Sequence, residues 1–198
     1  FVPILGEYKN RRGETEARQL VDNVATLLFL ILLVVTAIGM AAAPILVYIS
    51  APGFAADTDK FALTIELTRI TFPYILFMSL IALSGGVLNT WSRFAVPAFT
   101  PVLLNLSFIG MALFVAPRLD RPVIALGWAV FLGGALQLAF QIPSLRRIRM
   151  LPRFSFNWKD AGVRRILGLM APAVVGVSVA QISLLINTVI AYFLSTGS

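Results

Sequence analysis

The 198-residue sequence contains neither cysteine nor histidine. These absences exclude disulfide scaffolds, Cys/His zinc sites, thiol nucleophiles and histidine general bases. Charged residues are also scarce, at 13% of the chain, where soluble domains have about 25%. The nine acidic residues fall in loops or near the ends of apolar runs, and none stands beside a nucleophile and a base at a catalytic spacing. We therefore predict no enzyme activity and no catalytic, cofactor-binding or metal-binding residues.

Apolar residues take the place of the missing charge and make up 59% of the chain. They form long runs with few charges, each of about the ~20 residues that a helix needs to cross a bilayer. Buried core helices of a large soluble protein are the alternative, but so many such runs in one short chain disfavour it. The predicted fold class is all-α, a polytopic transmembrane helical bundle, with spans over residues 24–49, 61–88, 97–116, 122–143 and 166–198.

Lysine and arginine are distributed unevenly around these runs. Four precede the first run, one lies between the second and third and seven lie between the fourth and fifth, which places twelve on one side of the membrane and three on the other. Because positive loops stay inside, the rich side is predicted to be cytoplasmic. The basic segment 144–165 also carries Phe154, Phe156 and Trp158. Nucleic-acid contact is one interpretation of this mixture, but an interfacial segment that binds membrane lipids is favoured beside two spans.

The fifth run contains three weak points at a spacing of four residues, Gly168, Pro172 and Gly176. This spacing places them on one helix face, and proline removes a backbone hydrogen bond. We predict a hinge here, with close helix packing as the alternative interpretation. Gln181 and Asn187 follow in the same run and are candidates to line a polar path.

Glu66 and Arg69 are the charged residues inside the second run. Their spacing of three places them on one helix face, where they can pair. Ionisable residues within a membrane predict function, whereas an arginine that reaches the interface has a purely structural role. Both interpretations remain open for this pair.

Three stretches of sequence carry a resemblance to a known family. They are the opening FVPILGEYK, the run from Ala51 to Asn105 that includes TRITFPYILFMSLIALSGGVLNTWSRF, and APAVVGVSVAQISLLINT from Ala171 to Thr188. Collinear over essentially the whole chain, these residues resemble the MurJ (MviN) family of bacterial lipid II flippases. The chain begins without Met and ends directly after an apolar run, so we expect a piece of a longer protein that covers the end of the family's helix two through helix seven.

The resemblance implies a two-lobe fold of the multidrug/oligosaccharidyl-lipid/polysaccharide exporter type. Residues 1–143 then belong to the first lobe, 144–165 form a basic cytoplasmic linker between the lobes, and 166–198 form the first helix of the second lobe. The implied activity is transport of lipid II, the undecaprenyl-pyrophosphate-linked peptidoglycan precursor, across the bacterial inner membrane by alternating access. The family's essential cavity arginines map outside this chain.

Ion coupling and substrate are the points on which alternatives remain. Some members of the family carry a carboxylate of a proposed sodium site on helix seven, where this chain has Asn187 and no acid. A coupling ion is therefore implied by the family but not by these residues. The alternatives to lipid II transport are export of drugs or polysaccharide-lipid within the same superfamily, and a non-transporting membrane scaffold.

Overall fold

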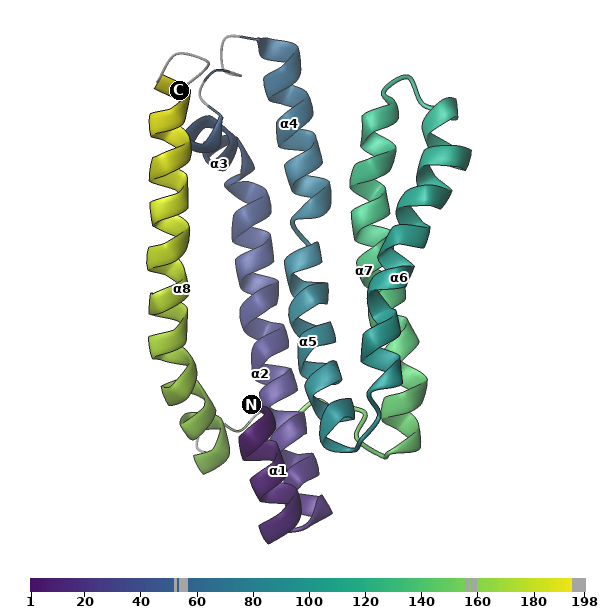
Figure 1. The fold of residues 1–198 in the computed structure, drawn as a ribbon, viewed down its shortest axis with the longest axis vertical. Coiled ribbons are helices and arrows are strands. Elements are labelled where there is room, and N and C mark those ends of the chain that lie inside the picture. Colours follow the sequence, from purple (N-terminus) through teal and green to yellow (C-terminus); the bar gives the residue numbers. More distant parts are fainter. Residues whose placement is uncertain (52, 54–56, 156, 158–159, 194–198) are drawn as a thin grey trace.

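The computed structural model describes residues 1–51, 53, 57–155, 157 and 160–193, which form a bundle of roughly upright helices (Figure 1). Among these described residues, five helical stretches are long and apolar enough to cross a membrane. The predicted all-α class and the presence of five candidate membrane spans are therefore confirmed. These stretches are Glu14–Ala41, Thr58–Thr90, Ala95–Arg118, Pro122–Arg147 and Ala161–Leu184.

The helices pack with α5 and α2 in the middle of the bundle. Helices α6 and α7 pack together on one side of this pair, α8 lies on the other side against α2, and α1 packs across the lower ends of α2 and α5 (Figure 1). The elements in chain order are α1 (Val2–Arg11), α2 (Glu14–Ala41), α3 (Ala43–Ser50), α4 (Thr58–Thr71), α5 (Tyr74–Thr90), α6 (Ala95–Gly110), a π-helical turn (Met111–Val115), a 3-10 turn (Ala116–Arg118), α7 (Pro122–Arg147) and α8 (Ala161–Phe193).

The first predicted span, 24–49, differs from the structure at both ends. Helix α2 begins earlier, at Glu14, because a helix continues through polar residues that hydropathy alone excludes. It stops at Ala41, where Pro44 lacks the N–H that the carbonyl of Met40 would accept. The Nε of Arg69 donates to that carbonyl instead, at 3.3 Å. The break after Ala41 therefore leaves the carbonyl of Met40 free to accept from Arg69, an arginine inside the second predicted span.

Glycine lets α7 approach two neighbouring helices closely. A Cβ at Gly133 would lie 2.5 Å from Leu104 Cδ1 on α6, and one at Gly134 would lie 2.8 Å from Tyr74 Cδ2 on α5. Such distances are too short for a real side chain, so the two glycines are needed for the close packing of α5, α6 and α7.

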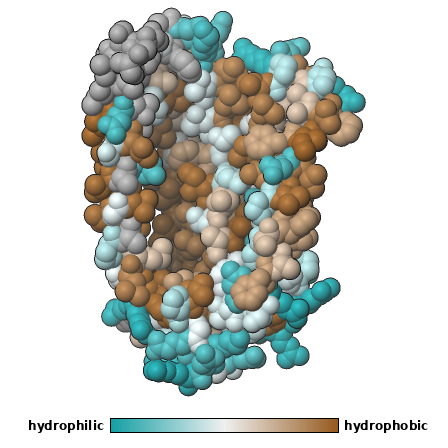
Figure 2. Space-filling view, viewed as in Figure 1, coloured by the Kyte–Doolittle hydropathy of each residue, from teal (hydrophilic) through white to brown (hydrophobic). Residues whose placement is uncertain are grey.

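Lysine and arginine gather at one end of the bundle, which we call the basic end. The start of α2, the α5–α6 turn and the α7–α8 segment lie together there with α1, and the α3–α4 and α6–α7 connections lie at the far end (Figure 1). Figure 2 shows a hydrophilic rim at each end with a hydrophobic belt between them. A cluster of buried apolar residues from α1, α2, α5, α7 and α8 closes the basic end. The grouping of the basic loops agrees with the predicted topology.

The predicted linker 144–165 is shorter in the structure. Helix α7 continues to Arg147 and α8 starts at Ala161, so the described residues between them, 148–155, 157 and 160, form a non-helical connection. The prediction from hydropathy ended α7 too early and started α8 too late, because the basic residues in these terminal turns resemble a loop in sequence. Phe156 and Trp158 of this connection lie outside the described residues.

Candidate functional site

The α7–α8 connection folds back onto α2 rather than extending into solvent. The backbone N–H of Arg153 donates to Asp22 Oδ1 at 2.8 Å, and that of Ser155 donates to Thr26 Oγ1 at 3.0 Å. The hydroxyl of Ser155 donates to Asn23 Oδ1 at 2.7 Å. Asn23 is 2% exposed, so this buried amide is paired as burial requires. We call these contacts, together with those of Asp160 described next, the clasp.

One carboxylate joins the clasp to the start of α8. The Oδ1 of Asp160 accepts the backbone N–H groups of Gly162 at 2.8 Å and Val163 at 3.1 Å. These two donors open the helix and have no intrahelical partner, so Asp160 is an N-cap. Its Oδ2 accepts from Asn23 Nδ2 at 3.2 Å. The same side chain therefore starts α8 and fixes that start to α2.

Packing and an ion pair add to this attachment. A Cβ at Gly162 would lie 2.6 Å from Leu20 Cδ1 and 2.7 Å from the Tyr8 hydroxyl, so α8 touches α1 and α2 at this residue. Ile166, one turn further, is 3% exposed within the core of the basic end. Arg165 Nη1 lies 2.9 Å from Glu7 Oε2 on α1. The first turns of α8 are therefore anchored on the rest of the chain.

Beyond Ile166 the exposure of the α8 side chains changes. Every side chain that the structure describes from Leu167 to Asn187 is exposed. Figure 1 shows the lower end of α8 inclined toward α1 and the rest of the helix upright. An apolar helix whose described side chains are exposed over this length can offer its surface to lipid or to other parts of a larger protein.

The predicted hinge residues follow directly after the anchored turns. Gly168, Pro172 and Gly176 lie within α8, which continues unbroken through the proline. A Cβ at either glycine would meet open space, so packing within this chain does not require glycine there. Pro172 leaves the carbonyl of Gly168 without its helical donor. The three residues therefore weaken α8 at the point where its support ends.

The other predicted residues are placed apart from the clasp. Gln181 and Asn187 are exposed on the bare part of α8. Glu66 and Arg69 line a cavity of about 620 Å³ together with Pro44 and Trp128 near the far end of the bundle. In the structure they take different partners, because Glu66 lies 4.0 Å from Arg121 Nη1 while Arg69 binds a backbone carbonyl of α2.

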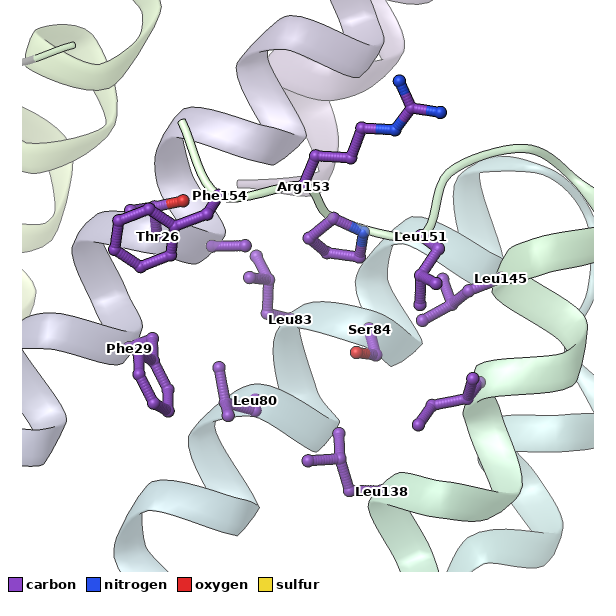
Figure 3. A pocket seen from close by; sticks show the side chains of 13 residues that line it. Thr26, Phe29, Leu80, Leu83, Ser84, Leu138, Leu145, Leu151, Arg153 and Phe154 are labelled. Carbon is purple, nitrogen blue, oxygen red and sulfur yellow. The ribbon is translucent and has the colours of Figure 1, made fainter. Parts of the chain in front are cut away.

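An apolar cavity of about 300 Å³ lies beneath the clasp, between α2, α5 and α7 (Figure 3). Phe154 turns toward Thr26 and Phe29 at its edge, whereas the side chain of Arg153 points away from it. The walls are mostly Leu and Phe side chains, so the cavity suits an apolar group and not a charged one.

Known proteins share similarity with this sequence over its whole length. The profile of the family "Lipid II flippase MurJ" matches residues 1–198. The chain belongs to the MurJ family. It is 48% identical to the lipid II flippase MurJ of Burkholderia cenocepacia over 202 aligned residues, which cover 100% of this chain and 39% of that protein. The probable lipid II flippases MurJ of Haemophilus influenzae and Vibrio cholerae are 42% and 40% identical, again over 100% of this chain.

This chain thus spans about two fifths of the length of the MurJ relatives it matches. Family membership makes it part of a multi-pass membrane protein of the bacterial inner membrane. The description of the family names a flippase, which is a transporter and not an enzyme.

A buried polar chain inside this MurJ-family bundle is not among the site residues predicted from the sequence. Gln137 Nε2 donates to the carbonyl of Thr100 at 3.1 Å, and the Tyr74 hydroxyl lies 3.4 Å from Gln137 Oε1. Gln141 Nε2 donates to Thr100 Oγ1 at 3.2 Å. These bonds link α5, α6 and α7. The spacing of four between the two glutamines was the available signal, because it places both on one face of an otherwise apolar helix.

Proposed function

We propose that the full-length protein moves lipid II across the bacterial inner membrane by alternating access. In this proposal residues 1–143 build the first lobe, 144–165 connect the lobes, and 166–198 open the second lobe. The MurJ family match and the relatives named as lipid II flippases support the substrate. Alternating access requires two lobes around a central site, and this chain holds most of one.

The observation that carries the proposal is the change of support along α8. Its first turns are fixed to α1 and α2 by Asp160, Arg165 and Ile166, while the described side chains after Ile166 are exposed. A second lobe that packs on this bare length can move as a body while the clasp stays closed. The weak points at Gly168, Pro172 and Gly176 give α8 the place to bend between the two lobes.

The orientation of the transporter follows from the basic end. We infer that this end faces the cytoplasm, since positively charged loops are retained there. The chain has no cysteine of its own, so single cysteines report topology directly. In intact cells a cysteine at Ser92, in the α5–α6 turn, should resist a membrane-impermeant thiol reagent, and one at Thr58 should react. The reverse pattern would contradict the orientation.

Complementation tests the function. Cells depleted of their own lipid II flippase should grow when they express the full-length protein, and these 198 residues alone should not rescue them. Changing Gly168, Pro172 and Gly176 together to alanine should abolish rescue while the amount of protein in the membrane stays normal. Failure of the unaltered full-length protein to rescue, with normal membrane levels, would refute lipid II transport. Export of a drug without rescue would favour the drug-exporter alternative.

A further inference from the structure

A second cavity at the basic end has a different character from the one under the clasp. It measures about 250 Å³ and lies between the α5–α6 turn and the last turns of α7. Its lining combines basic, hydroxyl and apolar side chains: Ser92, Arg93, Phe94, Ala95, Val96, Ser144 and Arg147. Helices α6 and α7 stand on the side of α2 and α5 away from α8 (Figure 1). The cavity therefore lies between helices on the side of α2 and α5 that faces away from α8 (Figure 1).

The backbone holds Arg93 in a fixed position at this cavity. Ser92 has a φ of 57°, a left-handed conformation that is uncommon for residues other than glycine. The N–H of Ser92 donates to the carbonyl of Asn89 at 3.0 Å, and that of Arg93 donates to the carbonyl of Leu88 at 2.9 Å. These bonds close the end of α5 as a tight C-cap. The arginine thus leaves a short, hydrogen-bonded turn rather than a long loop.

The polar groups of the cavity are suited to an anion. Within the described part of the chain, no carboxylate pairs with the guanidinium groups of Arg93 and Arg147, and none lines the cavity. The hydroxyls of Ser92 and Ser144 have no described hydrogen-bond partner either. Guanidinium groups bind phosphate oxygens through charge-assisted and often bidentate hydrogen bonds. Two of them beside two hydroxyl donors match a phosphate.

An apolar surface adjoins this polar cavity on its membrane side. Phe94, at the rim, is 61% exposed. One helical turn deeper, Phe99 on α6 and Phe140 on α7 lie in contact with ring centroids 5.6 Å apart. Phe99 is four residues after the cavity residue Ala95, and Phe140 is four residues before Ser144, so both share the faces that bear the cavity. A ligand with a phosphate in the cavity would place its apolar part along these rings.

We propose that this cavity binds the phosphate of an anionic phospholipid in the leaflet at the basic end. The adjoining rings favour a lipid over free phosphate, because only a lipid uses both surfaces. Basic pockets between transmembrane helices bind anionic headgroups in this manner. The site does not depend on which substrate the full-length protein moves.

Native mass spectrometry of the full-length protein in detergent tests the site. The probe is phosphatidylglycerol, with zwitterionic phosphatidylcholine and inorganic phosphate as the comparison ligands. Arg93→Gln together with Arg147→Gln should weaken phosphatidylglycerol binding about thirtyfold, since each arginine near the surface contributes about fivefold. Arg146→Gln with Arg164→Gln is the matched control. It removes the same charge from the same end but spares the cavity, and should leave binding within about twofold of the unaltered protein, as expected for screened surface charges.

A third variant covers the case in which the double arginine variant does not fold. Ser92→Ala with Ser144→Ala keeps the charge and should weaken phosphatidylglycerol binding by a smaller factor, about fivefold, through the loss of two hydrogen bonds from uncharged donors. Equal losses in the cavity and control variants would overturn the proposal, because general attraction to the basic end would then explain binding. Phosphatidylcholine that binds as tightly as phosphatidylglycerol would overturn it too. Inorganic phosphate that displaces phosphatidylglycerol at similar concentration would identify a free-anion site and refute the lipid.

Discussion

Replacing Asp160 by alanine should release the start of α8 from the rest of the chain. This carboxylate caps the helix through the N–H groups of Gly162 and Val163 and accepts from Asn23 on α2. Alanine removes both functions at once. Serine retains the capping oxygen but is too short to reach Asn23, so Asp160→Ser separates the cap from the tie to α2.

The expected loss of stability is the sum of two contributions, the N-cap of α8 and the hydrogen bond to Asn23. An N-cap replaced by alanine costs about 1 kcal/mol. The lost tie leaves Asn23 Nδ2 without its acceptor, and since Asn23 is 2% exposed, that adds about 1–3 kcal/mol. We expect Asp160→Ala to destabilise the clasp by about 2–4 kcal/mol. The Asp160→Ser variant should lose only the contribution of the hydrogen bond to Asn23.

Hydrogen exchange of the full-length protein measures this directly. Local opening exposes the amides of residues 161–166, so their protection should fall about 30- to 1000-fold in Asp160→Ala. Peptides from α6 and α7 should exchange as before and serve as the internal reference. Unchanged protection of residues 161–166 in the alanine variant would show that Asp160 does not hold α8 and would refute the clasp.

Two further predictions concern the packing of α7, each measured by thermal unfolding of the full-length protein. Gly134→Ala should lower the free energy of unfolding by about 1–3 kcal/mol, because the new Cβ would lie 2.8 Å from Tyr74 Cδ2. Gly110→Ala is the control and should be neutral or slightly stabilising, because a Cβ there meets open space. Equal effects of the two variants would contradict the packing argument. Gln141→Leu should be close to neutral, because the loss of its one hydrogen bond to Thr100 Oγ1 is offset by the removal of a buried Oε1 without a described partner. Gln137→Leu should cost about 1–3 kcal/mol through its two lost hydrogen bonds. A larger loss for Gln141→Leu than for Gln137→Leu would contradict this account of the polar chain.

Hydropathy and charge predicted the elements of this chain better than their ends. Long apolar runs predict helices because a single segment in a membrane can satisfy its own backbone hydrogen bonds only as a helix, and five candidate spans are found among the described residues. The start of α2 at Glu14 was missed since polar residues end a hydropathy run without ending a helix. Pro44 is visible in the sequence, but the sequence alone does not show that the helix breaks after Ala41.

The clasp was out of reach of sequence reasoning for another reason. Asn23 and Asp160 stand 137 residues apart, and no local pattern marks such a pair. The segment 144–165 was recognised by charge alone, which indicates the membrane surface but not the contact with α2. The weak points of α8 were visible because proline and glycine act locally. Their position directly after the last anchored residue, Ile166, became apparent only in three dimensions.

The central claim is that α8 is fixed at its start and bends beyond Ile166 during transport. Electron spin resonance distances in nanodiscs test it, with spin labels on the full-length protein at exposed Ile38 of α2 and at either Arg164 or Ile182 of α8. We predict one unchanged Ile38–Arg164 distance with and without lipid II. The Ile38–Ile182 pair should show two distances whose proportions shift with lipid II. A single, unchanged Ile38–Ile182 distance in a protein that transports, or an equal shift at Arg164, would contradict the account.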